Sequence, residues 1–201
     1  MIDLYAAGTS NGTRARIALE ECGLAYTLHP IALDKGEHKT PQFLALNPNA
    51  QIPVIVDHEG PGGKPLTLSQ SGAILIYCAE KSGRFMPREG AARAAMWQAL
   101  MSASTDIGPT FGAANAVAKS HPEAAQQFRS RLRQYFEVWN ARLAKQKYAA
   151  GEELTIADFS LYAGYARTRG AAPQVLESMP ALERWASEMA ARPGVQRAVR
   201  F

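Results

Sequence analysis

The order of strand-like and helix-like segments up to Phe85 constrains the fold of this chain more than any other feature. Stretches of alternating hydrophobicity, typical of strands, take turns there with stretches of helical periodicity. The order is strand, helix, strand, helix, strand, strand, helix, over residues 2–6, 13–22, 26–33, 40–44, 53–56, 66–69 and 71–81. The first strand–helix–strand unit requires parallel strands, and the turn-rich residues 60–63 join the last two strands as an antiparallel hairpin. A mixed four-stranded sheet with helices on its faces, the thioredoxin-like arrangement, is therefore predicted.

A different pattern begins after residue 83. Residues 84–90 contain Pro, Gly and charged side chains, a composition typical of a linker. From residue 91 to residue 201 the apolar positions recur at helical spacing, and the breaks between helices fall at Gly and Pro. We therefore expect two domains, an α/β domain over 1–83 and an all-α helical bundle over 91–201.

The formal net charge of +4 is unevenly distributed along the chain. Up to Phe85 there are 7 Lys and Arg against 8 Asp and Glu, and beyond it there are 15 against 10. A basic second half would suit nucleic acid, but its basic residues are interleaved with Glu along helical repeats, which favours solvated helix faces. We expect no nucleic-acid partner, although a mildly basic surface would attract an anionic small molecule.

Cysteine and histidine usage narrows the class of protein further. Cys22 and Cys78 are far apart in the sequence and lie on apolar faces of predicted helices, so we expect core residues and no disulfide framework. The four histidines have no metal-ligand spacing. The N-terminus lacks the pattern of a secretory signal, and no apolar stretch approaches the roughly 20 residues needed to cross a bilayer. A cytoplasmic protein without a metal site and without membrane contact is expected.

The turn between the first strand and the first helix carries three adjacent polar side chains, Thr9, Ser10 and Asn11. Ligands of such folds bind beyond the carboxyl ends of parallel strands, where helix N-termini point. Hydroxyl and amide donors at this place would hydrogen-bond a thiolate and lower its pKa. Plain capping is the alternative, because Ser, Thr and Asn are also the preferred N-cap residues. The turn contains no cysteine, which excludes a glutaredoxin-type dithiol mechanism.

Two further places could bind a peptide-like ligand. Pro53 opens an apolar strand, and a cis Ile52–Pro53 bond would turn the backbone groups of Ile52 outward to pair with such a ligand. A trans proline that merely begins the strand is equally compatible with the sequence. Gln70 and Ser71 start the next predicted helix, where free N–H groups and a hydroxyl could hold a carboxylate or simply cap the helix.

A capping box is predicted at Thr155 and Asp158, with Asp in place of the usual Glu or Gln. Leu154 and Phe159 would form the accompanying hydrophobic staple. This is a structural device, for which we expect about 1 kcal/mol per cap.

The joint order of these pieces resembles the cytosolic glutathione transferases over essentially the whole chain. The matching pieces are residues 5–21, 47–56, 70–77 and 151–158. Within that superfamily, Thr9-Ser10-Asn11-Gly12 followed by residues 17–21 is most similar to the bacterial nu-type members. Those proteins are glutathione-dependent disulfide-bond oxidoreductases without a catalytic cysteine. The resemblance implies a thioredoxin-like glutathione-binding domain followed by an all-helical domain.

The resemblance also implies roles for individual residues. Thr9 and Asn11 would hold and activate the glutathione sulfur, while Ser10 could instead serve as a serine-type activator. Ile52, ahead of a cis Pro53, would pair with the cysteinyl backbone of the ligand. The remaining implied contacts with glutathione are Gln51 beside Ile52, Gln70 and Ser71 at the γ-glutamyl carboxylate, His38 near the glycyl end, and Arg129 contributed by a partner subunit.

Glutathione is thus expected as a co-substrate, with no separate cofactor. The leading hypothesis for the reaction is reduction of disulfides by thiol–disulfide exchange. Conjugation of glutathione to a small-molecule electrophile is the alternative enzyme activity, and a non-catalytic glutathione-binding or stress-response module is the alternative from another class. The family is typically homodimeric, so a homodimer is expected here.

Overall fold

The computed structural model describes all residues from Met1 to Phe201 and divides the chain into two compact units. The first unit contains Met1–Phe85 together with Arg192–Phe201, and the second contains Met86–Ala191. The sequence pattern placed residues 192–201 in the helical domain. They group with the first unit because the last helix packs against the first helix of the chain.

The first unit is built on the expected mixed four-stranded sheet. Its strands are β1 (Ile2–Ala6), β2 (Tyr26–Pro30), β3 (Val54–Asp57) and β4 (Leu66–Ser69), in the spatial order β2-β1-β3-β4. β1 pairs with β2 in parallel, and β3 is antiparallel to both β1 and β4. The predicted parallel unit and antiparallel hairpin are therefore confirmed.

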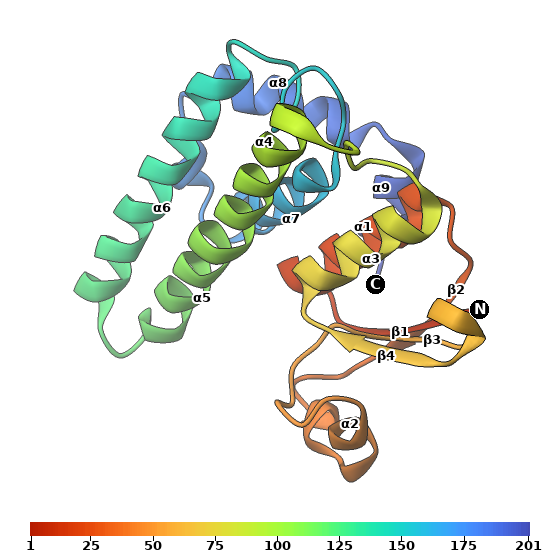
Figure 1. The fold of residues 1–201 in the computed structure, drawn as a ribbon. Helices are drawn as coiled ribbons and strands as arrows, with labels where there is room; N and C mark the ends of the chain where they lie inside the picture. Colours follow the sequence, from red (N-terminus) through yellow and green to blue (C-terminus); the bar gives the residue numbers. More distant parts are fainter. The chain divides into compact units, whose positions relative to one another are not determined.

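Helices cover both faces of this sheet (Figure 1). α1 (Ser10–Cys22) and α3 (Ser71–Ser82) lie on one face, and the short α2 (Pro41–Leu46) lies on the other. β1 alternates buried and half-buried side chains, as a strand between two unlike faces should. The core under α1 and α3 consists of fully buried aliphatic side chains, among them Leu4, Ile17, Leu19, Ile55, Ile74 and Leu75. Cys22 and Cys78 are buried and free, as expected.

The two largest differences between predicted and observed boundaries in this unit are at the start of α1 and the end of β2. α1 begins at Ser10 rather than at Thr13, because Thr9 takes the N-cap position and starts the helix one turn earlier. β2 ends at Pro30 rather than at Leu33, because its only partner strand, β1, ends at Ala6, the residue that pairs with Pro30.

The second unit is helical throughout its regular segments. Its helices are α4 (Gly90–Met101), α5 (Gly108–Val117), α6 (Pro122–Leu143), α7 (Ile156–Ala171) and α8 (Pro180–Ala190), and the last helix of the chain, α9 (Pro193–Ala198), belongs to the first unit. The sequence predicts helix over residues 91 to about 118 with a break at Gly108-Pro109, and in the structure a π-helical segment, Ser102–Ile107, separates α4 from α5, which begins at Gly108. Pro109 cannot donate to a carbonyl one turn earlier, and the hydroxyl of Thr105 donates to the carbonyl of Met101 at 2.9 Å. Both features loosen the α-helical ladder here.

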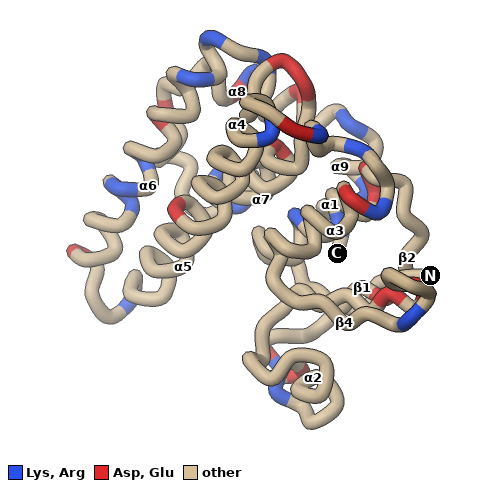
Figure 2. The backbone as a smooth tube through the Cα atoms, in the orientation of Figure 1, with Lys and Arg blue, Asp and Glu red and all other residues tan.

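Basic and acidic residues are interspersed on the surface of the second unit, including along α6 (Figure 2). Arg133 pairs with Glu137 one turn later at 2.9 Å, which is the pattern of a solvated helix face. None of the helices combines the length and the apolar character that crossing a membrane would require.

Candidate active site

The sheet register brings four predicted site segments to one end of the first unit. Ala6, the last residue of β1, pairs with Pro30, so the chain leaves β1 and β2 at the same edge. Tyr5 pairs with Val54 and Val54 with Ser69, so β3 starts and β4 ends at that edge. The segments that follow or precede these strand ends are 7–12, 31–40, 47–53 and 70–72. Polar groups from all four therefore gather beyond one edge of the sheet.

The β1–α1 turn is held by its own backbone and by Thr9. The N–H of Thr9 donates to the carbonyl of Ala7 at 2.7 Å, and the N–H of Thr13 donates to the carbonyl of Thr9 at 2.8 Å. The N–H of Gly12 donates to Thr9 Oγ1 at 3.1 Å. A Cβ on Gly12 would lie 2.1 Å from the carbonyl oxygen of Ala7, so this position requires glycine. The sequence pattern included Gly12 without revealing this close approach.

Thr9 caps the helix and still has a hydrogen-bond donor to offer. A hydroxyl has one donor and two acceptor sites, and the cap uses only one acceptor. The capping and ligand-binding interpretations of Thr9 are therefore compatible. The N–H groups of Ser10 and Asn11 precede the first bonded amides of α1, and they lie at the positive end of its dipole. Ser10 is half-buried and Asn11 is exposed.

The Ile52–Pro53 peptide bond is cis. Pro53 is buried, whereas Ile52 is half-buried and lies outside the ladder, which begins at Val54. The preceding loop is organised by Asn47, a buried side chain that donates to the carbonyl of Gln51 at 2.7 Å and accepts from the N–H of Asn49 at 3.1 Å. Asn47 was not among the residues predicted from the sequence. Its neighbours do not distinguish an asparagine that is buried and organises a loop from one that merely ends a helix.

Gln70 and Ser71 lie where β4 passes into α3. Gln70 is the N-cap of α3 and has a φ of 71°, a conformation that a non-glycine residue seldom adopts. Such backbone is found where ligands are held. The N–H of Ile74 donates to the carbonyl of Gln70, which leaves the N–H groups of residues 71–73 without a helical partner. Ser71, the residue that follows Gln70, is buried, with 8% of its surface exposed.

His38 lies in the first unit, after β2, whereas Arg129 lies in the second unit. His38 lies in a short 3₁₀ helix, Glu37–Lys39, in the loop after β2, and its Nδ1 atom is buried without a hydrogen-bond partner. Arg129 lies on α6 in the second unit, where it lines a small cavity of about 80 Å³ with Arg133 and Gln174. Its expected role concerns a second copy of the chain and stays a prediction.

A buried ionic network lies at the end of β3, opposite the end at which the candidate site is found. Asp57 at the end of β3 is fully buried and accepts from the hydroxyl of Tyr77 at 2.5 Å, from Lys81 at 2.8 Å and from the N–H of Glu59 at 2.9 Å. Burial raises the pKa of the Asp57 carboxyl, but the hydrogen bonds from Lys81, Tyr77 and Glu59 outweigh it, so the pKa lies below its ordinary value of 3.8. Since Tyr77 and Lys81 belong to α3, Asp57 ties that helix to the sheet.

We expect Asp57→Asn to lower the free energy of unfolding at neutral pH by about 2 kcal/mol, since a charge-assisted hydrogen bond contributes about 1.5–3 kcal/mol. A lowered folded-state pKa contributes stability above the unfolded pKa, and this is lost as pH falls through the folded value. The difference between wild type and variant should thus be constant above about pH 5 and shrink below about pH 4. Denaturant unfolding at several pH values measures it. The exposed Glu80→Gln is the control, and an equal effect of both changes would contradict the prediction.

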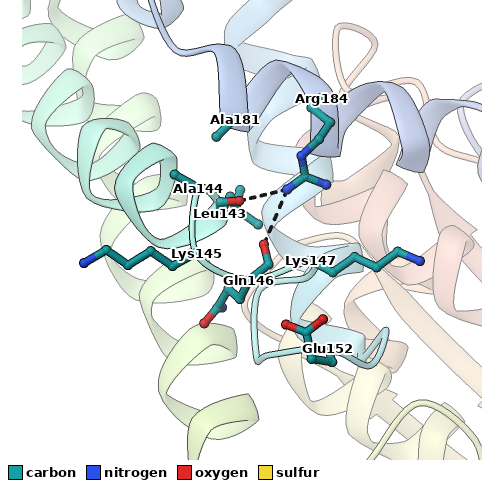
Figure 3. Close-up of a pocket in the computed structure, with 8 residues that line it drawn as sticks. All are labelled: Leu143, Ala144, Lys145, Gln146, Lys147, Glu152, Ala181 and Arg184. Atoms are coloured by element: carbon teal, nitrogen blue, oxygen red, sulfur yellow. Dashed lines mark hydrogen bonds between the residues drawn. The ribbon is translucent and has the colours of Figure 1, made fainter.

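Two larger cavities are not lined by any of the predicted glutathione contacts. In the first unit a cavity of about 420 Å³ between Tyr5 and α2 is lined by Ile31, Glu37 and Phe43 among others. In the second unit a cavity of about 350 Å³ lies where α6 ends against α8. Figure 3 shows the lysines at its rim, Lys145 and Lys147, pointing away from each other.

Arg184 explains the polar lining of this second cavity. Its guanidinium donates to the carbonyls of Leu143 and Gln146 at 2.8 and 3.4 Å, the two dashed contacts of Figure 3. These are carbonyls that the end of α6 leaves without helical partners, so Arg184 acts as a C-terminal cap. The polar groups that line this cavity are therefore explained by the structural role of Arg184.

Comparison with known families matches both units. Residues 10–81 match the family described as glutathione S-transferase, N-terminal domain, and residues 92–193 match glutathione S-transferase, C-terminal domain.

Individual relatives agree with these matches. The disulfide-bond oxidoreductase YfcG of Escherichia coli is 37% identical, over 99% of this chain and 94% of the relative. The disulfide-bond oxidoreductase YghU of the same organism is 32% identical, over 98% of this chain and 73% of the relative.

Solved structures with bound glutathione have the same fold. A glutathione transferase family member from Pseudomonas fluorescens, with two glutathione molecules bound, superposes with a TM-score of 0.94 at 35% identity, covering 98% of this chain and 92% of that one. A glutathione transferase from Pseudomonas putida, with one glutathione disulfide bound per subunit, gives a TM-score of 0.94 at 31% identity, covering 100% and 91%.

Proposed function

The chain belongs to the glutathione S-transferase family, and from this membership we propose that it reduces disulfides with glutathione as the electron donor. The observation that carries the proposal is the β1–α1 turn, where Thr9 and Asn11 present donors at a helix N-terminus and no cysteine is present. The two Escherichia coli relatives that are disulfide-bond oxidoreductases support the same reaction.

In the proposed site, glutathione lies across the edge at which the four segments meet. Its γ-glutamyl carboxylate binds Gln70, Ser71 and the free N–H groups of α3. The backbone groups of Ile52, next to Gln51, pair with the cysteinyl part of the ligand. His38, in the loop after β2, is the proposed contact of the glycyl end.

The proposed chemistry balances with two glutathione molecules. A glutathione thiolate, stabilised by the Thr9 hydroxyl and the Asn11 amide, attacks one sulfur of the substrate disulfide and displaces the other sulfur as a thiolate. A second glutathione thiolate then attacks the mixed disulfide, releasing glutathione disulfide and the second substrate thiol. Two glutathione thiols are oxidised and one disulfide is reduced. The two glutathione molecules bound in the Pseudomonas fluorescens structure support this stoichiometry.

Conjugation of glutathione to an electrophile is the second candidate. The observation that favours it is Ser10, whose half-buried hydroxyl makes no hydrogen bond within the protein and could activate the thiol itself. We also propose that the active form is a homodimer in which Arg129 of one copy faces the site of the other.

The proposal predicts glutathione-dependent reduction of a small model disulfide, measured as NADPH consumption by coupled glutathione reductase. Because both cysteines are buried and burial raises the pKa of each thiol, they are not nucleophiles. We expect Cys22→Ala and Cys78→Ala to retain kcat within about twofold, a change too small for a lost nucleophile.

An electrophile assay with the same enzyme separates the two reactions. Disulfide turnover lost in either cysteine variant while its fold is intact would contradict the cysteine-free mechanism. Turnover of an electrophile without turnover of the disulfide would favour conjugation.

A further inference from the structure

The last ten residues of the chain run along α1 toward the turn that carries Thr9. α9 packs against α1, and the C-terminus lies beside α1 in Figure 1. The segment Arg192–Phe201, which we call the strap, belongs to the same compact unit as the candidate site. Its side-chain contacts with α1 run from Glu21, near the end of that helix, back to Arg16 in its middle.

At the far end of α1 the strap is anchored by buried charge. Arg192 donates to the Glu21 carboxylate from Nε at 3.1 Å and from Nη2 at 2.5 Å. The Glu21 side chain is only 6% exposed, so Arg192 compensates a charge that would be costly alone. A Cβ on Gly194 would lie 2.5 Å from Glu21, so the backbone of α9 approaches as closely as glycine permits. One turn further, Arg197 donates to Glu20 at 2.6 Å.

Arg16 connects this anchor to the end of the strap. Its Nε donates to the hydroxyl of Tyr26 at 2.8 Å, and that hydroxyl donates to Glu20 at 2.7 Å. Its Nη1 donates to the carbonyl of Arg200, and its guanidinium lies 5.1 Å from the centre of the Phe201 ring. The ring is thus held by a cation–π contact whose cation is itself fixed by two hydrogen bonds.

Phe201 in turn lies beside the residue that precedes Thr9. A Cβ added to Gly8 would lie 3.6–3.7 Å from atoms of the Phe201 side chain. Gly8 is exposed and has no side chain, so few contacts within the turn restrict its backbone. The Phe201 ring, itself 43% exposed, limits by its position the conformations in which Thr9 can present its hydroxyl.

We propose that Phe201 and Arg16 are positioning residues that hold the β1–α1 turn in the geometry needed to stabilise the glutathione thiolate. The inference rests on the proposed function, because it concerns the same Thr9 and Asn11 donors. Neither residue touches the sulfur. They act by keeping these donors in place, and an error of about 1 Å in such geometry can cost a hundredfold in rate.

The test compares Phe201→Ala with Phe201→Tyr, which keeps an aromatic ring under Arg16, and with Val199→Ala, an exposed position of the same strap. We expect Phe201→Ala to lower kcat/KM for glutathione about tenfold and to shift the acidic limb of its pH profile upward, because fewer sulfurs are ionised. Phe201→Tyr should restore both quantities, and Val199→Ala should leave them unchanged. A purely structural role would lower the melting temperature without moving the pH profile, and that result would overturn the proposal.

Amide hydrogen exchange tests the strap independently of catalysis. The N–H groups of Gly12 and Thr13 bond to Thr9, so their exchange reports opening of the turn. We expect Phe201→Ala to accelerate both about tenfold, with no change in β3. Unchanged exchange would overturn the proposal even in an active enzyme. If exchange accelerates but the wild type shows no glutathione-dependent turnover, the strap holds the turn and the proposed function is the part that fails.

Discussion

Replacing Thr9 with valine is expected to lower kcat/KM for glutathione about a hundredfold, the usual cost of removing one donor to a developing anion. The reason is that the Thr9 hydroxyl has a donor left over after it caps α1. Valine has nearly the same shape but removes both the cap and that donor, so two matched variants are needed to separate the effects.

Thr9→Ser keeps the acceptor for the Gly12 N–H and the donor for the sulfur, and should remain within about threefold of wild type. Thr9→Asp keeps the acceptor, so α1 stays capped, but a carboxylate has no donor and repels a thiolate. We expect Thr9→Asp to be as inactive as Thr9→Val while unfolding near the wild-type midpoint. Full activity in Thr9→Asp would show that capping is the only role of this residue.

The neighbouring substitutions decide which group activates the thiol. If Thr9 and Asn11 act together, Asn11→Ala should lose activity as well, and Ser10→Ala should not. Loss confined to Ser10→Ala would reassign the activator to Ser10 and favour conjugation of electrophiles. Steady-state kinetics with a disulfide and with an electrophile as second substrates measure both reactions on the same variants.

Asp158→Ala is expected to lower the free energy of unfolding of the second unit by about 3–5 kcal/mol, the range for disrupting a buried charged group. The Asp158 carboxylate is completely buried and accepts from the N–H of Ala149 at 2.7 Å, the N–H of Thr155 at 2.9 Å and Nε1 of Trp185 at 3.0 Å. The Thr155 hydroxyl donates to the same carboxylate at 3.2 Å. Removing the carboxylate leaves these four buried donors without their acceptor, at about 1–3 kcal/mol for each that stays unpaired.

Tryptophan fluorescence during denaturant unfolding measures this effect, because all three tryptophans, Trp97, Trp139 and Trp185, lie in the second unit. Asp158→Asn keeps one acceptor oxygen and should cost less than the alanine variant. Glu152→Gln removes an exposed carboxylate nearby and should change stability by less than about 0.5 kcal/mol. An Asp158→Ala variant within 1 kcal/mol of wild type would mean that the network relaxes into other contacts.

The capping box shows how much of a local interaction can be predicted from the sequence. Thr155 and Asp158 form it as predicted, and the structure adds two partners, Ala149 and Trp185, that the pattern could not indicate. For this reason we expect Asp158 to contribute more than the roughly 1 kcal/mol of an ordinary cap. A cap depends on residues three apart, whereas Trp185 lies 27 residues from Asp158 and meets it only when α8 packs against α7.

The sequence likewise indicated only part of the candidate site, and the fold supplied the rest. The sequence indicated the turn at Thr9, the proline at 53 and the start of α3 as separate weak signals. The strand order β2-β1-β3-β4 brings them to one edge, and the Ile52–Pro53 bond, whose state the sequence left open, is cis in the structure. Asn47 and Asp57 were missed because burial decides their importance, and burial is a property of the folded chain.

The sequence by itself determined the order of elements, the mixed sheet, the change to helices after residue 83 and the family. These follow from periodicity, turn residues and caps, which operate over a few to about 20 residues. Only the tertiary structure decided that residues 192–201 return to the first unit. The contacts that hold them join residues more than 170 positions apart, such as Glu21 and Arg192. Their pairing depends on burial and approach of backbones, which no local pattern records.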